Sequence, residues 1–264
     1  QQIGFDTNPV SPTFGNANAY TLLLAPAERC DLIVDFSQVP AGSKLILYSD
    51  APAPFPSGDP LNDYFTGDPD QTASGGAATT LPGKGPNTRT LMQFRVGSLV
   101  GVADGPNQSI PQNVALGLQQ KVIFQPIQPL PISKAQVRRL TLNEDFDYWG
   151  RLIQRLGTVS QNGLNNQGLP TWGRKYQANA TEMPKAGALE IWEIYNLTGD
   201  THPIHFHLVN VQVLARQPFD AANFNGAPVF TGPARPPDAN EGGWKETVRM
   251  NPNEMTRIIM KFDL

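Results

Sequence analysis

The sequence predicts an all-β protein built as a β-sandwich, and three observations support this fold class. The 264 residues include 24 glycines and 25 prolines, and proline interrupts nearly every long segment, which disfavours long helices. Short runs of residues alternate between apolar and polar, as half-buried strands do, and turn residues separate these runs. The first 50 residues contain no amphipathic stretch of ordinary helical length.

Four strands are expected in the N-terminal part of the chain. An apolar run at 20–24 is followed by a turn at 26–29 and by an alternating run at 30–36. Residues 45–48 form the next apolar run, and residues 91–96 are expected to complete the sandwich. Together these runs predict one β-sheet unit before residue 97.

Two long segments lack a strand pattern. Residues 49–89 are rich in Pro, Gly, Asp, Ala and Thr, and a loop of this length is uncommon in a compact domain. Within it, Tyr64 and Phe65 either pack the loop onto the surface or face a substrate, and a surface loop is the favoured interpretation. Residues 98–136 contain five widely spaced prolines, so we expect an extended interdomain connection there.

A second domain is expected from Val137 onward. Its strands share alternating or β-branched sequences and are expected at 137–142, 190–196, around Val248, and at 256–262. Residues 145–151 are expected to form a turn and the start of a strand, and 160–173 and 216–244 to form loops.

The composition is that of a globular protein, with 39% hydrophobic and 16% charged residues. A formal net charge of −3 offers no basic field, so nucleic acid and anionic membranes are not expected partners. No apolar run reaches the roughly 18 residues that a bilayer-spanning helix needs. The single cysteine, Cys30, excludes an intrachain disulfide; we expect a small buried apolar side chain, and a disulfide to another chain is the alternative.

All three histidines of the chain lie in one ten-residue stretch, Asp200–Val209. His205 and His207 are two residues apart, so in a β-strand both rings point to the same face. His202 lies just upstream, and Pro203 stiffens the backbone between them. Two imidazoles on one face with a third on the approach predict part of a site for copper, zinc or iron.

Other interpretations of this stretch stay open. The histidines could simply satisfy hydrogen bonds where a strand begins, or could form a closed mononuclear site like the HxH site of cupin-like proteins. The second interpretation is weakened because Leu208–Val211 contains no carboxylate. Asp200 either binds a histidine ring or lies in a turn, and the turn is favoured.

The segment His202–Leu208 resembles the HPxHxH motif in the last cupredoxin domain of multicopper oxidases, and is most similar to the group of bacterial and spore-coat laccases, bilirubin oxidases and phenoxazinone synthases. Residues 24–36 resemble the second domain of that family. The sequences on either side of the motif, at 189–196, 231–233 and 243–247, also resemble this family. The resemblance implies Greek-key, cupredoxin-like β-sandwich domains, with 1–97 as the C-terminal part of the second domain, 98–136 as the linker and 137–264 as the third domain without its final strands.

The resemblance also implies copper. His202 corresponds to a ligand of the type 1 copper and to the catalytic entry point for electrons. His205 corresponds to a ligand of the type 2 copper and His207 to a ligand of the type 3 pair, which together form a trinuclear cluster. A laccase of this kind takes single electrons from phenols, arylamines or similar small aromatic substrates, and passes four of them to O2, which leaves as water.

The chain departs from the family in its ligand set. Family members carry two HxH pairs in the first domain and an HCHxxxH segment near the C-terminus, and neither motif occurs here. The three methionines at 250, 255 and 260 precede the missing cysteine and are expected in the core, not as axial ligands. We therefore expect the remaining segments of the oxidase as separate chains that cover an otherwise open sheet edge. The resemblance further implies a secreted, periplasmic, or spore- or cell-surface location.

Two other functions remain as alternatives. The chain could be a copper-free cupredoxin scaffold that binds partners, or a mononuclear three-histidine metal enzyme. The retention of every histidine in one motif argues against the scaffold, and the metal content of the assembled protein separates all three functions.

Overall fold

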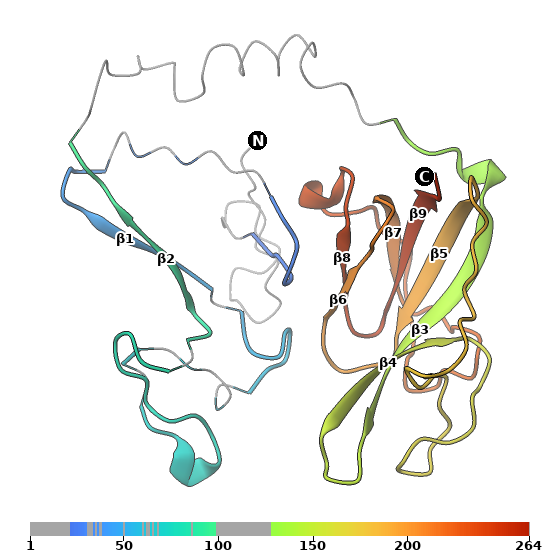
Figure 1. Ribbon diagram of the computed structural model, residues 1–264, viewed down its shortest axis with the longest axis horizontal. Helices are drawn as coiled ribbons and strands as arrows, with labels where there is room; N and C mark the ends of the chain where they lie inside the picture. Colours follow the sequence, from blue (N-terminus) through green and yellow to red (C-terminus); the bar gives the residue numbers. More distant parts are fainter. Residues whose placement is uncertain are drawn as a thin grey trace. The chain divides into compact units, whose positions relative to one another are not determined.

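The computed structural model describes residues 22–30, 34, 36, 39–49, 51–59, 61, 64, 66–67, 69–85, 87–98 and 128–263. The chain divides into two compact units, a C-terminal unit of Gln1–Arg29 with Gln128–Leu264 and a middle unit of Cys30–Ile127 (Figure 1). Among the described residues no helix is long and apolar enough to cross a membrane.

The middle unit contains an antiparallel pair of strands, β1 (Lys44–Tyr48) and β2 (Thr90–Arg95). These strands confirm the predictions at 45–48 and 91–96. Phe36 packs on Phe94 of β2, with ring centroids 5.2 Å apart. A 3-10 turn, η2 (Thr72–Ser74), lies in the long loop between the strands.

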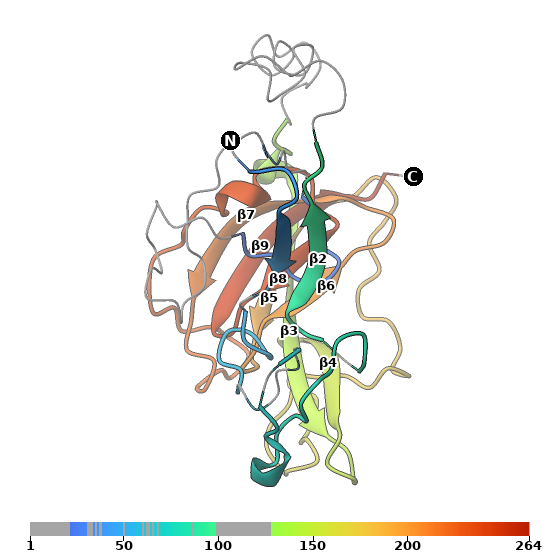
Figure 2. The same cartoon turned by 90° about the vertical axis from the view of Figure 1, so that its left-hand side faces the viewer.

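The C-terminal unit contains a five-stranded sheet in the order β4-β3-β5-β9-β7 (Figure 1). Its strands are β3 (Gln136–Phe146), β4 (Leu152–Thr158), β5 (Leu189–Asn196), β7 (Val211–Pro218) and β9 (Glu254–Lys261). Only β3 and β5 run parallel; the other neighbours in this sheet are antiparallel. The far half of β3 pairs with β4 alone, so this hairpin extends past β5 (Figure 2).

A second, two-stranded sheet pairs β6 (His202–His205) with β8 (Thr247–Met250) in antiparallel register. Two 3-10 turns, η3 (Ile132–Lys134) and η4 (Ala239–Glu241), complete the described elements of this unit. The strands predicted at 137–142, 190–196, around Val248 and at 256–262 are confirmed. The all-β prediction is confirmed as well, because the described elements are strands apart from these short turns.

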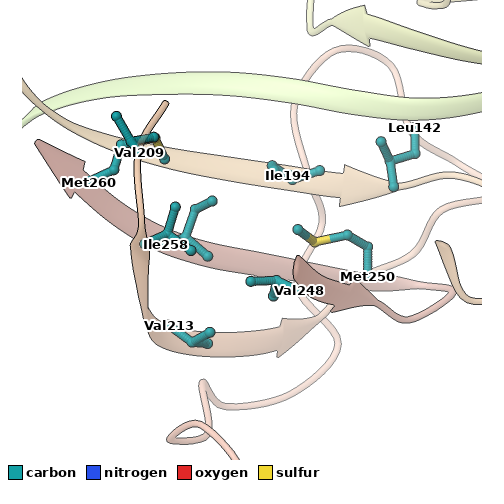
Figure 3. Packing of buried hydrophobic residues seen from close by; sticks show 9 residues of the cluster. Leu142, Ile194, Val209, Val213, Val248, Met250, Ile258 and Met260 are labelled. Atoms are coloured by element: carbon teal, nitrogen blue, oxygen red, sulfur yellow. The ribbon is translucent and has the colours of Figure 1, made fainter. Parts of the chain in front are cut away.

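The core of the C-terminal unit lies between the five-stranded sheet and β8 (Figure 3). Val248 and Met250 of β8 are completely buried against apolar side chains from β3, β5, β7 and β9. Met260 belongs to the same cluster, and Met255 belongs to a second one with Tyr195. The prediction that the three C-terminal methionines are core residues is therefore confirmed.

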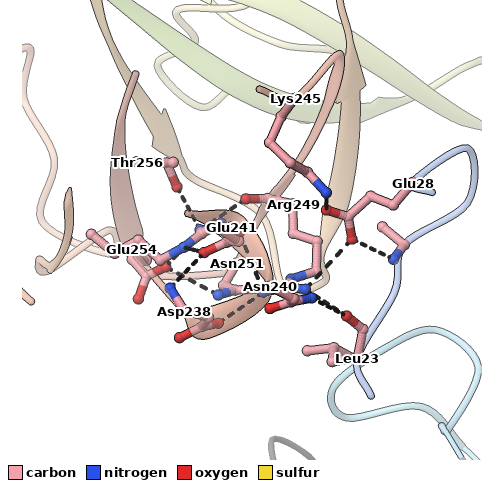
Figure 4. A network of polar contacts seen from close by, with 12 residues as sticks. Leu23, Glu28, Asp238, Asn240, Glu241, Lys245, Arg249, Asn251, Glu254 and Thr256 are labelled. Carbon is pink, nitrogen blue, oxygen red and sulfur yellow. Dashed lines mark hydrogen bonds and ion pairs between the residues drawn. The ribbon is translucent and has the colours of Figure 1, made fainter. Parts of the chain in front are cut away.

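A buried polar network lies on the other side of β8 (Figure 4). The side chain of Arg249 is 1% exposed and contacts the carboxylates of Glu28 and Asp238 and the carbonyl of Leu23. Through these contacts the N-terminal residues 22–29 belong to the same compact unit as β8. Buried ion pairs with this many partners constrain geometry more than they add stability.

Three predictions need correction. Residues 22–24 form no strand, because the carbonyl of Leu23 accepts hydrogen bonds from the side chains of Asn240 and Arg249 rather than from a neighbouring strand. Cys30 is free and half-buried, not fully buried. The loop predicted from 216 begins later, because β7 runs to Pro218.

Much of the predicted strand at 30–36 and linker at 98–136 lies outside the described residues. The domain boundaries at 97 and 137 stay a prediction, and the compact units divide the chain differently, after Arg29 and after Ile127.

Candidate metal centre

The turn that leads into the histidines is built around Asn196, the last residue of β5. Its side chain is fully buried, and its amide donates hydrogen bonds of 2.8 Å to the carbonyls of Asp200 and Met250. Its side-chain oxygen accepts a bond of 2.9 Å from the backbone N–H of Thr198. The turn therefore fixes where β6 starts, and with it the position of His202 beside β8.

His202 lies in a buried polar environment and is 8% exposed. Its Nε2 is 2.7 Å from Thr198 Oγ1, 3.3 Å from Asp200 Oδ1 and 3.4 Å from Glu144 Oε1. The hydroxyl of Thr198 donates its one proton to Asn196 Oδ1, so it accepts from His202, and this favours the tautomer with the proton on Nε2. The other nitrogen, Nδ1, lies 3.4 Å from the amide nitrogen of Gln154, which donates.

Burial lowers the pKa of His202, and the charge of Asp200 partly opposes this effect. Burial also raises the pKa of Glu144 to about 7, and the neighbouring Asp200 carboxyl adds to the increase. Both directions follow from removing charged groups from water. Each of Glu144, Asp200 and His202 offers an atom within 4.8 Å of the others, so Nε2 faces an oxygen-rich cluster.

His202 and Gln154, which contacts its Nδ1, both line an open pocket between β3, β4 and β6. Its lining residues are Leu142, Asn143, Gln154, Arg155, Leu156, Asp200, Thr201, His202, Pro203 and Ile204. The pocket is therefore lined by both apolar and polar groups, with the His202 ring among them.

His205 and His207 form a ring pair, with centroids 5.0 Å apart and planes at 81°. Both rings are exposed. His207 lies just outside β6, which ends at His205, and Leu208 adopts φ 75°, which turns the chain away from the strand direction. The predicted proximity of the two rings is confirmed, whereas the prediction that one continuous strand carries both is wrong.

His202 and His205 project from opposite faces of β6. They lie three positions apart within one short strand, and side chains alternate along a strand, so an odd offset places them on opposite faces. Burial agrees, because His202 and Ile204 lie on the core side whereas His205 is exposed. The histidines thus define two places on the molecule, one on each face of the strand.

Asp200 has both of the roles that the sequence left open, since it lies in the bend before β6 and its carboxylate reaches the His202 ring. Sequence reasoning missed Thr198, Gln154 and Glu144 as neighbours of His202. The one available signal was the polar triplet that contains Glu144, at 143–145 after the apolar run of β3.

These features define a class: an all-β protein whose clustered imidazoles are candidate metal ligands on two faces of one strand. The sequence model of the multicopper oxidase family matches residues 151–264. A laccase from Bacillus subtilis is 33% identical over 263 residues, covering 99% of this chain and 40% of the relative. A laccase from Bacillus stratosphericus is 32% identical over 242 residues, covering 90% of this chain and 37% of the relative.

Among solved structures, a variant of the McoA multicopper oxidase from Aquifex aeolicus is 23% identical, with a TM-score of 0.42, covering 88% of this chain and 36% of that protein. The chain is a partial member of the multicopper oxidase family, and this membership implies copper as its cofactor. The mostly stranded structure agrees with the cupredoxin-like β-sandwich expected for it. The chain spans about two fifths of the length of the curated laccases it matches.

The donor set fits copper. Imidazole nitrogen is a common ligand of copper, and each of two rings has one nitrogen held by a threonine hydroxyl, Nε2 of His202 by Thr198 and Nδ1 of His205 by Thr247. The His205–His207 pair lies on an exposed face that a metal ion can reach.

Proposed function

We propose that this chain is the part of a laccase-type multicopper oxidase that supplies His202 to the type 1 copper and His205 and His207 to the trinuclear cluster. The observation that carries the proposal is the placement of His202 and His205 on opposite faces of one four-residue strand. A single strand that serves two metal sites links them through a short stretch of backbone. A mononuclear site made of all three histidines would instead need them on one side.

The residues of this chain have distinct roles in the proposal. Thr198 holds Nε2 of His202, so that Nδ1 is the nitrogen offered to metal, and Gln154 lies against Nδ1 before metal binds. Bound copper would supply the one-electron chemistry. The Asn196-centred turn keeps the His202 ring in place, which preserves the distance to the ring pair beyond the strand.

The substrate class and partners extend the same proposal. The relatives are named laccases, which supports small aromatic reductants such as phenols or arylamines with O2 as electron acceptor. Because the chain spans only part of these relatives, the remaining copper ligands are proposed to come from the other segments of the oxidase, present as separate chains. We also propose that the protein is exported, either secreted, periplasmic, or on a spore or cell surface.

Titration of the purified chain with Cu(II), followed by electron paramagnetic resonance, tests the proposal. We expect the histidine pair to bind copper through two imidazole nitrogens, and H205A and H207A to remove this signal. H202A serves as the matched control and should leave the signal of the pair unchanged. Loss of the same signal in all three variants would favour the mononuclear enzyme, and no binding by the unaltered chain would favour the copper-free scaffold.

A further inference from the structure

Thr247 of β8 lies between His205 and the N-terminal segment of the C-terminal unit. It is 1% exposed and stands directly opposite His205 in the register of β6 and β8. Its Oγ1 is 2.8 Å from His205 Nδ1 and 3.2 Å from the carbonyl oxygen of Ala27. The hydroxyl therefore has two neighbours, one on each side.

The number of protons decides the direction of both bonds. A threonine hydroxyl has one proton to donate, and a carbonyl oxygen can only accept. Thr247 must therefore donate to Ala27 and accept from His205, so the proton of the neutral imidazole is on Nδ1. A neutral ring carries one N–H, which leaves the lone pair of His205 on Nε2.

The carbonyl of Ala27 is held in place by a tight turn. Ala27 has φ 66°, a left-handed conformation that is unfavourable for a residue other than glycine. The turn is closed by a bond of 3.0 Å from Glu28 N–H to the carbonyl of Ala25, and by one of 2.8 Å from Ala25 N–H to Glu28 Oε2. An unfavourable backbone conformation of this kind persists only where surrounding contacts enforce it.

Glu28 anchors this turn to β8 (Figure 4). Its carboxylate is completely buried and lies 3.2 Å from Lys245 Nζ and 3.5 Å from Arg249 Nη1. These two cations stand two residues before and two residues after Thr247, so the turn is fixed on both sides of the hydroxyl. Arg29 adds an ion pair with Glu246.

We infer that Thr247, oriented by the Ala25–Glu28 turn, is a positioning residue that makes Nε2 the metal-binding nitrogen of His205. The inference rests on the proposed function, because it assumes that His205 binds metal. The two faces of β6 then use different ring nitrogens for metal: His202 offers Nδ1, and His205 offers Nε2. The N-terminal segment thereby acts on the metal site through Thr247.

Nitrogen-15 NMR of the metal-free chain, labelled on histidine, tests the inference directly. At a pH at which the spectrum shows neutral rings, we expect His205, assigned with H205A, to have its proton on Nδ1. T247V removes the acceptor and should shift the ring toward the Nε2–H tautomer, whereas T247S should retain the unaltered pattern. T201V is the matched control, because Thr201 bonds to Asn251 and not to a ring.

A Cu(II) titration of the same proteins separates this inference from the proposed function. We expect T247V to bind Cu(II) about tenfold more weakly than the unaltered chain, because losing the hydrogen-bond partner of a metal-binding histidine typically weakens metal affinity by about this factor. T247S should restore the affinity. An Nε2–H ring in the unaltered chain would overturn the inference, and this spectrum decides even if T247V does not fold. An Nδ1–H ring in a chain that binds no copper would leave the tautomer assignment standing and refute the oxidase.

Discussion

Arg216 is the most completely enclosed charged residue in the described core, with 0% exposure. Its guanidinium donates to the carboxylates of Glu241 and Glu254, to Thr256 Oγ1 and to the carbonyl of Arg249. The charges of Arg216 and Arg249 keep the pKa of Glu241 below its ordinary value, despite the burial that would raise it. Removing Arg216 takes from both carboxylates their fully buried partner and leaves each with one other arginine, Arg249 for Glu241 and Arg235 for Glu254.

We therefore expect R216A to lower the free energy of unfolding by about 3–5 kcal/mol, the cost of breaking a buried charge network. Urea unfolding followed by tryptophan fluorescence measures it. R139A is the matched control, since Arg139 is 55% exposed and its partner Glu193 keeps Arg257. It should cost about 1 kcal/mol or less. Equal losses in the two variants would contradict the argument.

Single residues also mark the limit of prediction from sequence. The three candidate ligands could be found because histidine occurs nowhere else in the chain. Thr247 could not, because threonine is common and the carbonyl that directs its hydroxyl belongs to Ala27, 220 residues away. Such roles depend on which segments pack together, and no local pattern carries that information.

At the scale of elements, alternation located most strands but not the end of β6. Apolar residues continue after the histidines, so the pattern predicts a longer strand than the four residues observed. The chain instead turns at Leu208 and reappears as β7 in the other sheet, paired with β9. A run of apolar residues indicates that a segment is buried. Both sheets bury their inner faces, so the pattern cannot show that the chain passes from one sheet to the other.

Gly157 in β4 shows a constraint on one element that can be tested. A Cβ at this position would lie 2.1 Å from the carbonyl oxygen of Trp172 and 2.7 Å from Thr141 Oγ1. The bridge between Gly157 and Gly173 brings the loop after β4 this close to the strand. The absence of a side chain at Gly157 is therefore what allows the loop to pack here.

We expect G157A to lower the free energy of unfolding by about 1–3 kcal/mol, because backbone must move to admit the methyl group. Thermal unfolding followed by circular dichroism measures the change. G97A is the control, because a Cβ on Gly97 meets nothing within 4 Å. It should change stability by no more than about 0.5 kcal/mol. A G157A protein as stable as G97A would show that the loop does not pack as described.

At the scale of the molecule, the two faces of the β6–β8 sheet have different partners. The inner face packs its apolar side chains in the core beside His202, and the outer face carries Thr247 and Arg249 toward residues 22–29. This division explains why the N-terminal segment clusters with the C-terminal unit, which a boundary drawn from sequence at residue 97 does not anticipate. Long-range ion pairs of this kind leave no local signature in the sequence.

The response of the whole fold to acid follows from its paired carboxylates. Burial acts to raise the pKa of Glu193, but hydrogen bonds from Arg257 and Tyr195 outweigh it and leave the pKa below 4.5. The pKa of Glu190 is lowered in the same way by Arg138 and Trp192. A carboxyl whose pKa is lower in the folded state stabilises the fold above its unfolded pKa, and this stabilisation is lost as the pH falls through the folded value.

We therefore expect E193Q to be less stable than the unaltered chain by about 1–3 kcal/mol at pH 7, the cost of losing charge-assisted hydrogen bonds in a buried site. Below pH 4.5 the unaltered chain should lose this advantage progressively, so the two melting temperatures should converge as the pH falls through the lowered pKa of Glu193. D263N is the control, because Asp263 pairs with Lys261 at 57% exposure and should matter little at either pH. A gap between E193Q and the unaltered chain that stays constant or widens in acid would mean that Glu193 is not stabilised as a carboxylate by its partners.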